Sequence, residues 1–123
     1  TGDYTPLLQS REAFAAECYA LMQSRCYRPK TIVEYDRKAF IAKENKIRVT
    51  FDSRIVATES NFDLFDERLN MTPVLALGAV VMEVKYNGFL LDYIRRMINT
   101  VDQSELSVSK YMLARQNGYR YRL

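Results

Sequence analysis

The 123-residue chain contains no histidine and only two cysteines, Cys18 and Cys26. The absence of histidine removes the most common general base and transition-metal ligand, so any bound metal should be a hard cation held by carboxylates and by its substrate. Two cysteines at this spacing make neither a disulfide framework nor a zinc site. We expect both to be reduced thiols, which fits a cytoplasmic protein.

Long apolar runs are also missing. No segment approaches the roughly 20 apolar residues needed to cross a bilayer, and the first residues lack the basic and then apolar pattern of a secretory signal. We therefore expect no membrane segment in this chain. The formal charge of +3 is small and indicates no class of partner by itself. The length and the apolar fraction of 48% predict a single globular domain, residues 1–123.

Three segments alternate in a way that places charged side chains on one face of a β-strand, because side chains reverse direction at every strand residue. The charged face would hold Val33, Tyr35, Arg37, Ala39 and Ile41 in the first segment, Arg48, Thr50 and Asp52 in the second, and Val81, Glu83 and Lys85 in the third. The opposite face would hold Ile47, Val49 and Phe51 in the second segment and Val80, Met82, Val84 and Tyr86 in the third. Such a sheet can bury one face and line the other for an ionic ligand.

The remaining pattern predicts an α+β fold with antiparallel strands. The strands are expected at 31–41, 46–52 and 77–86, the first two as a hairpin. Helices are expected at 10–28 after an extended or loose leader and at 89–99 after the Asn87-Gly88 turn, and a turn followed by a short helix is expected within 106–115. Residues 53–73 fit a surface helix or an ordered loop equally well, with a short strand possible at 55–58. Residues 119–122 are expected to form a frayed or surface-packed tail. Three or four strands cannot close a barrel by themselves.

Arg37 and Arg48 would lie on neighbouring strands and on the same face. Two guanidinium groups side by side repel each other, so this placement predicts compensation by acidic residues, by solvent or by an anionic ligand. Phosphate oxygens match the guanidinium fork, which makes polyphosphate groups a natural ligand. The alternative is a wet face on which both arginines are solvated.

Glu83 and Lys85 would form a pair on the same face. A single carboxylate among cations commonly holds Mg²⁺ or Mn²⁺ when phosphates supply the other ligands; the alternative is a surface ion pair of little energetic consequence. Lys110 could reach this face or be simply exposed, and Tyr35 could hydrogen-bond a phosphate or pack its ring. The basic and aromatic residues of the tail do not follow strand spacing, so no nucleic-acid partner is expected.

The segments EYDRKAF, KIRVTFD and VMEVKY and the late triplet SKY, in this order, resemble the VTC domain, the polyphosphate polymerase domain of the vacuolar transporter chaperone family. That family belongs to the triphosphate tunnel metalloenzymes, whose antiparallel strands close into a tunnel lined by basic and acidic residues. The matching segments extend over about residues 29–111. The resemblance implies that the sheet forms part of a tunnel-type barrel with flanking helices.

The resemblance also implies an activity and a set of site residues. The residues implied are Arg37, Arg48 and Lys110 as catalytic, phosphate-binding cations, Tyr35, Lys85 and Ser109 as further substrate-binding residues, and Glu83 as the metal ligand. The reaction would move the terminal phosphoryl group of ATP onto polyphosphate, assisted by Mn²⁺ or Mg²⁺. Phosphoryl transfer depends on positioning and charge neutralisation more than on a side-chain base, so it does not require histidine.

One departure from the family pattern is large. Members begin with a half that contributes the first tunnel strands and several further basic residues, and nothing in this sequence matches it. We therefore expect the chain to be the C-terminal portion of the domain, weak or inactive alone, with the missing strands supplied by an N-terminal half, a second copy or another chain. A half-tunnel would have open strand edges.

Three alternatives to a polymerase stay open at this point. An inorganic triphosphatase would use the same tunnel with water as the acceptor. A non-catalytic module would bind polyphosphate, inositol phosphate or nucleotide without metal-dependent turnover. An unrelated α+β domain would simply turn its polar sheet face to solvent.

Overall fold

The chain divides into two units, residues 1–30 and residues 31–123, in the computed structural model of the protein. The structure describes residues 3–101 and 109–120, with the backbone alone for residues 117–120. Each unit is described by itself below.

The first unit consists of two helices, α1 (Pro6–Gln9) and α2 (Ala13–Ser24). α2 confirms the helix predicted over 10–28, although it is shorter at both ends. α1 shows that the expectation of an extended or loose leader is wrong for these four residues. Proline suits the first helical turn, where its fixed φ is favourable and its missing N–H would have no partner. Both cysteines of this unit are free thiols, as expected.

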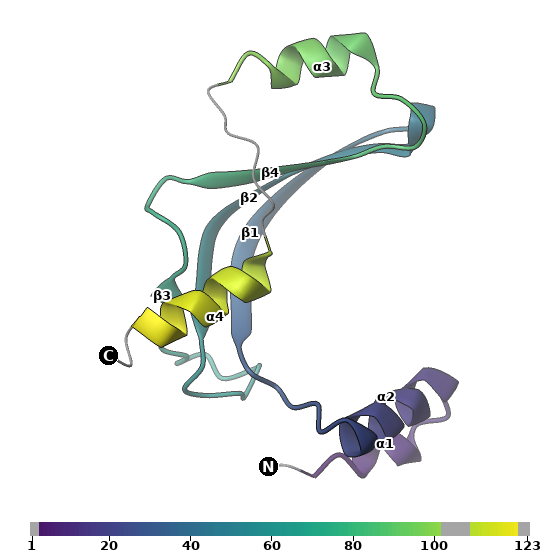
Figure 1. The fold of residues 1–123 in the computed structure, drawn as a ribbon, viewed down its shortest axis with the longest axis vertical. Coiled ribbons are helices and arrows are strands. Elements are labelled where there is room, and N and C mark those ends of the chain that lie inside the picture. Colours follow the sequence, from purple (N-terminus) through teal and green to yellow (C-terminus); the bar gives the residue numbers. More distant parts are fainter. Residues whose placement is uncertain (1–2, 102–108, 121–123) are drawn as a thin grey trace. The chain divides into compact units, whose positions relative to one another are not determined.

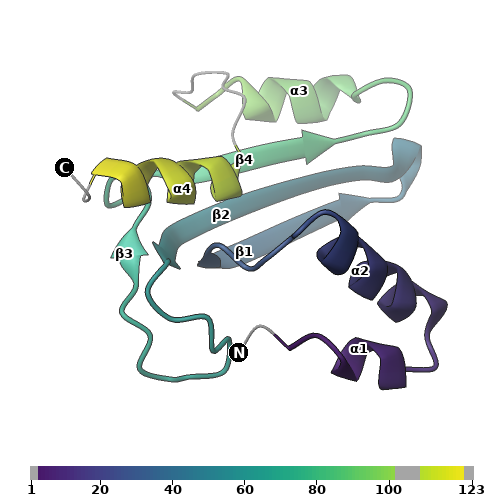
Figure 2. The same cartoon turned by 60° about the horizontal axis from the view of Figure 1, so that its bottom comes forward.

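The second unit is built on an antiparallel sheet with β2 in its centre (Figures 1 and 2). The strands are β1 (Ile32–Ala42), β2 (Ile47–Thr58), β3 (Thr72–Pro73) and β4 (Val80–Lys85). β1 pairs with one edge of β2 and both β3 and β4 pair with the other. A short 3-10 turn, η1 (Glu44–Lys46), joins β1 to β2 and confirms the predicted hairpin. The short strand expected at 55–58 is the end of β2.

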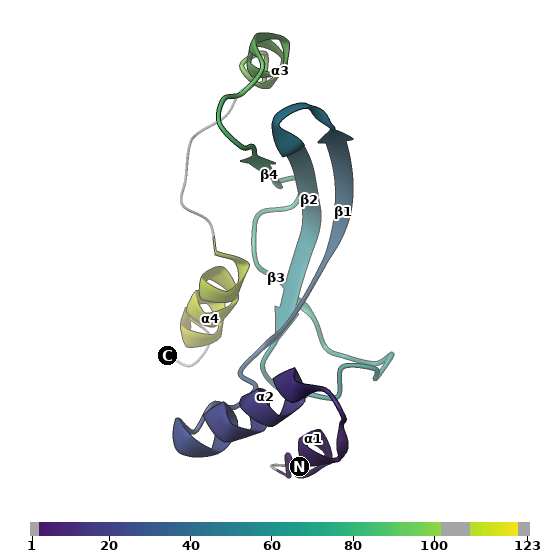
Figure 3. The same ribbon diagram turned by 90° about the vertical axis from the view of Figure 1, so that its right-hand side faces the viewer.

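Two helices flank the sheet and confirm the α+β class. α3 (Asp92–Ile98) lies near the β1–β2 turn, and α4 (Lys110–Arg120) lies near β3 (Figures 1 and 3). Residues 59–71 form turns rather than a helix, so the loop alternative is correct for them. Residues 119 and 120 of the expected tail continue α4, and 121–123 lie outside the described residues. Within the described ranges the outer edges of β1 and β4 pair with no further strand, so the sheet is open.

A β-bulge determines which side chains of β2 share a face. Two residues of β2, Arg54 and Ile55, oppose Tyr35 of β1 alone, where the register shifts. Arg54 has a φ of 51°, in the left-handed region that such a bulge requires. The extra residue reverses the alternation of β2, so Ile55 lies on the same face as Asp52.

The main apolar cluster lies on that same face. It comprises Ile55, Ala57, Val74 and Ala114, with Val33, Tyr35, Leu75, Val81 and Leu113 packed against it. The face that was predicted to be charged therefore continues, beyond the bulge, into an apolar core beneath α4. The pattern of residues 46–52 could not predict this core, because the bulge lies after residue 52. On the opposite face Ile47 is only 1% exposed, and Val49 and Phe51 line an apolar pocket together with Ile94 of α3. The prediction of an apolar environment for these three β2 residues is confirmed.

Candidate functional site

The strand register brings the predicted charged residues onto one face of the sheet. The facing residues, from the hairpin end toward the bulge, are Arg48 with Lys85, Thr50 with Glu83, and Asp52 with Arg37. We refer to these six residues as the polar face. Their common placement confirms the alternation predicted for all three strands.

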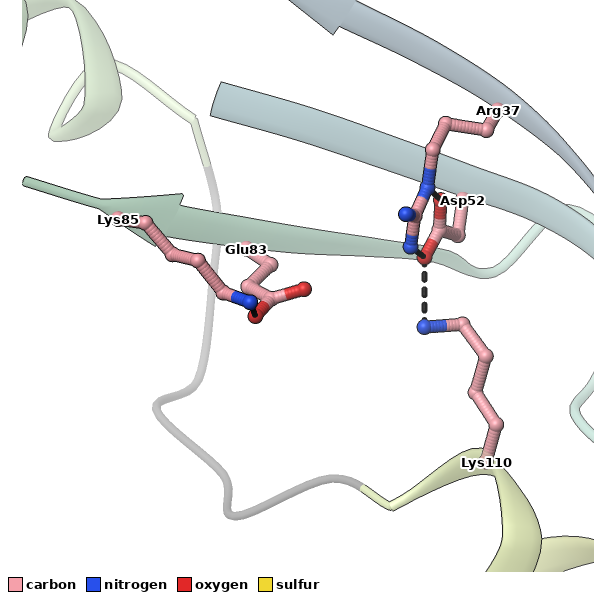
Figure 4. A network of polar contacts seen from close by, with 5 residues as sticks. All are labelled: Arg37, Asp52, Glu83, Lys85 and Lys110. Atoms are coloured by element: carbon pink, nitrogen blue, oxygen red, sulfur yellow. Dashed lines mark hydrogen bonds and ion pairs between the residues drawn. The ribbon is translucent and has the colours of Figure 1, made fainter. Parts of the chain in front are cut away.

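Asp52 accepts the shortest contacts on the polar face. Its side chain is fully buried. Arg37 donates two hydrogen bonds to it, from Nε to Oδ1 at 2.6 Å and from Nη2 to Oδ2 at 2.7 Å. Lys110 Nζ lies 2.6 Å from the same Oδ2 (Figure 4). Two cations, one from β1 and one from α4, therefore share a single carboxylate, and we refer to these three residues as the Asp52 cluster.

These contacts change the pKa values of the carboxylate and the guanidinium. The hydrogen bonds from Arg37 are the largest cause that lowers the pKa of Asp52 to about 2; burial opposes this change and the contact with Lys110 adds to it. The hydrogen bonds to Asp52 raise the pKa of Arg37 above its ordinary value. Asp52 is therefore ionised at neutral pH, and two cations with one carboxylate leave the Asp52 cluster with a net charge of one positive unit.

The ring of Tyr35 lies against both cations of the Asp52 cluster. Its centroid is 5.1 Å from Arg37 Cζ and 4.9 Å from Lys110 Nζ, distances at which a cation is attracted to an aromatic face. Tyr35 also packs on the apolar cluster beneath α4. Of the two roles considered for Tyr35, ring packing is the one that the structure shows, and its hydrogen bond to a phosphate stays a prediction.

α4 carries Lys110 to the polar face. The Lys110 side chain is 19% exposed, so it reaches the face as expected and is not simply solvated. Ser109 Oγ accepts a hydrogen bond from the Met112 N–H at 3.3 Å, which caps the start of α4. Arg115 of α4 binds Glu59 at 2.6 Å, just beyond β2. Ser109 thus has a structural role, and its contact with substrate stays a prediction.

Arg48 lies on the polar face but not beside Arg37. Arg37 faces Asp52 across the hairpin, whereas Arg48 faces Ile41. At about 3.3 Å per strand residue this register separates the two arginines by roughly 13 Å along the sheet. The expectation of two guanidinium groups side by side is wrong, and an acid compensates Arg37. Arg48 forms no ion pair with the residues that the structure describes.

Glu83 and Lys85 project from β4 on the polar face and bind each other (Figure 4). Lys85 Nζ lies 3.1 Å from Glu83 Oε1, and the two side chains are 70% and 42% exposed. The ion pair considered as an alternative is therefore present. The charge of Glu83 also contributes to the raised pKa of Arg37, so the Glu83 carboxylate acts electrostatically on the Asp52 cluster.

Asp52 and Thr50 are the polar-face residues to which sequence reasoning gave no role. Alternation placed both on the charged face, but the partner of an acid depends on strand register, which the sequence left uncertain. Thr50 Oγ1 is buried and has no hydrogen-bond partner among the described residues. A small hydroxyl in an apolar strand gives no signal of that kind in the sequence.

Comparison with known proteins identifies the family. The family model described as the VTC domain matches residues 2–118, nearly the whole chain, so the chain belongs to the VTC domain family. No curated protein and no solved structure matches the chain. The resemblance carried by the four segments is thus confirmed, and an unrelated α+β domain is excluded. Among the helices of residues 3–101 and 109–120, none has the length and apolar character to span a bilayer.

Proposed function

We propose that this member of the VTC domain family supplies part of the wall of a polyphosphate polymerase site, which transfers the terminal phosphoryl group of ATP to polyphosphate. Family membership supports a function related to polyphosphate. The observation that carries the finer proposal is the convergence of Arg37 and Lys110, from β1 and α4, on a polar face that also carries Glu83. The residues that complete the wall would come from an N-terminal half, a second copy or another chain.

The distribution of cations favours an extended polyanion over a single phosphate. Arg37 and Lys110 lie toward the bulge, and Arg48 and Lys85 lie toward the hairpin end of the same face. Arg37 uses two N–H groups on Asp52, which leaves the rest of its donor fork for phosphate oxygens. Arg48 is exposed and can bind phosphate directly. A linear chain of phosphates can contact both groups of cations at once.

Transfer would need little covalent chemistry from these residues. The bond between the γ-phosphorus of ATP and its bridging oxygen breaks, ADP leaves with that oxygen, and a terminal oxygen of polyphosphate forms the new bond to phosphorus. Arg37, Arg48 and Lys110 would hold the phosphates in line and neutralise the charge that the transferred group spreads over its oxygens.

The residues present fit Mn²⁺ or Mg²⁺ held mainly by substrate. Hard cations prefer oxygen ligands and keep one or two protein carboxylates when phosphates supply the rest. Glu83 offers one partly exposed carboxylate, and no cluster of three or more acids, cysteines or histidines that could hold a metal occurs in the described part of the chain. Such an ion would supply charge neutralisation on the phosphates when bound.

A binding-only role for this chain by itself is favoured by the open sheet. No further strands lie opposite the polar face within the described residues, so this chain by itself would contact a polyanion from one side. Hydrolysis is the alternative to transfer onto polyphosphate. If water were the acceptor of the phosphoryl group, the same site would act as an inorganic triphosphatase.

The test is incubation of this chain, and of any longer natural protein that contains it, with ATP and Mn²⁺. Long-chain polyphosphate on a gel would support the polymerase. Free phosphate without polymer would indicate a triphosphatase, and tripolyphosphate binding by calorimetry without turnover would indicate a binding module. Failure of both the chain and the longer protein to bind tripolyphosphate would overturn the proposal.

A further inference from the structure

Thr50 is a buried residue of the polar face whose hydroxyl group has no role in the proposed function. It lies in the middle of the central strand β2 and is only 3% exposed. Its Oγ1 is buried without a hydrogen-bond partner in the part of the chain that the structure describes. Buried polar groups are nearly always satisfied, because an unpaired hydroxyl has lost its hydrogen bonds to water. An unpaired donor on the polar face therefore points to a partner that reaches it in another arrangement of the site.

The register identifies the acceptor. Thr50 lies between Ala39 of β1 and Glu83 of β4. Ala39 offers only a methyl group, whereas Glu83 offers a carboxylate. Directly opposed residues in an antiparallel pair have Cβ atoms about 4.5–5.5 Å apart, within reach of a threonine hydroxyl and a glutamate carboxylate. Asp52, the next acid along β2, already binds Arg37 and Lys110.

The Glu83 carboxylate is free to make this change. It binds Lys85 in the structure, where the Lys85 side chain is largely exposed and the Glu83 side chain is partly exposed. Exposed ion pairs of this kind contribute little to stability, so Glu83 can leave Lys85 easily. Rotation toward Thr50 would bring the carboxylate over the central strand and would release the Lys85 ammonium group beside its cross-strand neighbour Arg48.

We propose that Thr50 is a positioning residue for Glu83: its hydroxyl donates a hydrogen bond to one carboxylate oxygen while the other oxygen coordinates a divalent cation that arrives with the substrate phosphates. The inference rests on the proposed function, because it needs Glu83 as the metal ligand. Hydrogen bonds from such supporting groups orient carboxylate ligands and strengthen metal binding. The same movement gives Lys85 a role, because its ammonium group then faces the phosphates together with Arg48.

The substitution Thr50→Val tests this, because it replaces the hydroxyl by a methyl group of similar size. Two quantities are measured: the melting temperature of the chain alone, and its affinity for tripolyphosphate by calorimetry with and without Mn²⁺. We expect an unchanged or higher melting temperature, because an unpaired buried hydroxyl is removed, and an unchanged affinity without metal. The gain in affinity that Mn²⁺ confers should fall by about tenfold or more. Thr50→Ser, which keeps the hydroxyl, should retain most of the gain.

Thr58→Val is the matched control on the same strand. Thr58 is also buried, at 5% exposed, but its Oγ1 hydrogen-bonds Ser60 Oγ at 2.9 Å. Its substitution should lower the melting temperature and leave the Mn²⁺ gain unchanged. Thr50→Val should therefore reduce the Mn²⁺ gain without lowering the melting temperature, and Thr58→Val should lower the melting temperature without reducing the Mn²⁺ gain.

The outcomes separate this inference from the proposed function. A full Mn²⁺ gain in Thr50→Val, or a marked loss of melting temperature in that variant, would overturn the role of Thr50 and leave the phosphate site intact. A parent chain whose affinity for tripolyphosphate is the same with and without Mn²⁺ would overturn both the role of Thr50 and the metal role of Glu83.

Discussion

Lys110 Nζ lies 2.6 Å from Asp52 Oδ2, although the two residues are far apart in the sequence. The contact joins the first residue of α4 to the central strand, on the face where Arg37 also binds Asp52. A carboxylate of the protein itself is therefore what allows these two cations to lie together. Since the same carboxylate also binds α4 through Lys110, Asp52 contributes both to the charge of the candidate site and to the stability of the fold.

Substitution of Asp52 should destabilise the fold. Asp52→Asn would leave Arg37 and Lys110 partly buried without their charged partner, and we expect a loss of roughly 3 kcal/mol in the free energy of unfolding, measured in urea. Asp36→Asn is the control, because Asp36 binds Arg54 in an exposed pair on the same hairpin, and its loss should be under about 1 kcal/mol. Equal losses in the two variants would show that burial of Asp52 contributes nothing.

The lowered pKa of Asp52 predicts sensitivity to acid. The pKa is about 2 in the folded protein and near the ordinary 3.8 in the unfolded chain. Because the folded-state value is the lower one, ionised Asp52 stabilises the fold fully above about pH 5, and this contribution is lost as the pH falls through about 4 toward about 2. Unfolding free energies of the parent and Asp52→Asn should converge over that window. A difference between them that is constant with pH would contradict the assignment.

The alternation of side chains was predictable and the register was not. Residues 46–52 follow a period of two with β-branched and aromatic residues on one face, so Ile47 and Arg48 were assigned to opposite faces correctly. The hairpin turn lacks an Asn-Gly pair and closes through η1 with Asn45 and Lys46 at positive φ, a geometry that the sequence does not signal. This turn sets the register in which Arg37 lies opposite Asp52. The sequence therefore could not predict that pair.

The bulge at Arg54 limited the prediction of the core in the same way. Arginine is not a residue that marks a left-handed position, so nothing in the sequence indicated that the alternation of β2 would reverse there. Ile55 and Ala57 consequently join the core beneath α4, which helps to place Lys110 on the polar face. The residue types of the site came from the sequence and the resemblance, whereas their contacts required the fold.

Arg48 offers the cleanest test of the polar face as a phosphate-binding surface, because it is exposed and forms no ion pair with the residues that the structure describes. We expect Arg48→Ala to weaken tripolyphosphate binding by about tenfold or more in calorimetry, as loss of a charge-assisted contact should. Lys38→Ala is the matched control, because Lys38 faces Phe51 on the opposite face of the same sheet. Similar losses in both variants would mean that net charge, and not the polar face, determines affinity. Arg37→Ala should also weaken binding, but it additionally removes two hydrogen bonds to buried Asp52, which then keeps only its contact with Lys110 among the described residues.

Ile47 tests the assignment of the two sheet faces. It is 1% exposed, whereas Ile41, at the other side of the hairpin turn, is 76% exposed. Ile47→Asp would bury an unpaired charge and should unfold the chain, and Ile41→Asp should leave the circular dichroism spectrum and the urea midpoint nearly unchanged. A folded Ile47→Asp variant with normal binding would reverse the assignment of the faces.

Glu83→Gln tests whether the carboxylate of β4 coordinates a metal ion. The substitution keeps the size of the side chain and removes its charge, so tripolyphosphate should bind at least as tightly without metal, because one negative charge leaves the polar face. The additional affinity conferred by Mn²⁺ should disappear, because a neutral amide is a much weaker ligand for a hard cation than a carboxylate. Glu44→Gln, in the exposed η1 turn, controls for the change in net charge and should keep the full Mn²⁺ gain. An equal gain in the parent and Glu83→Gln would remove Glu83 from the coordination of the ion.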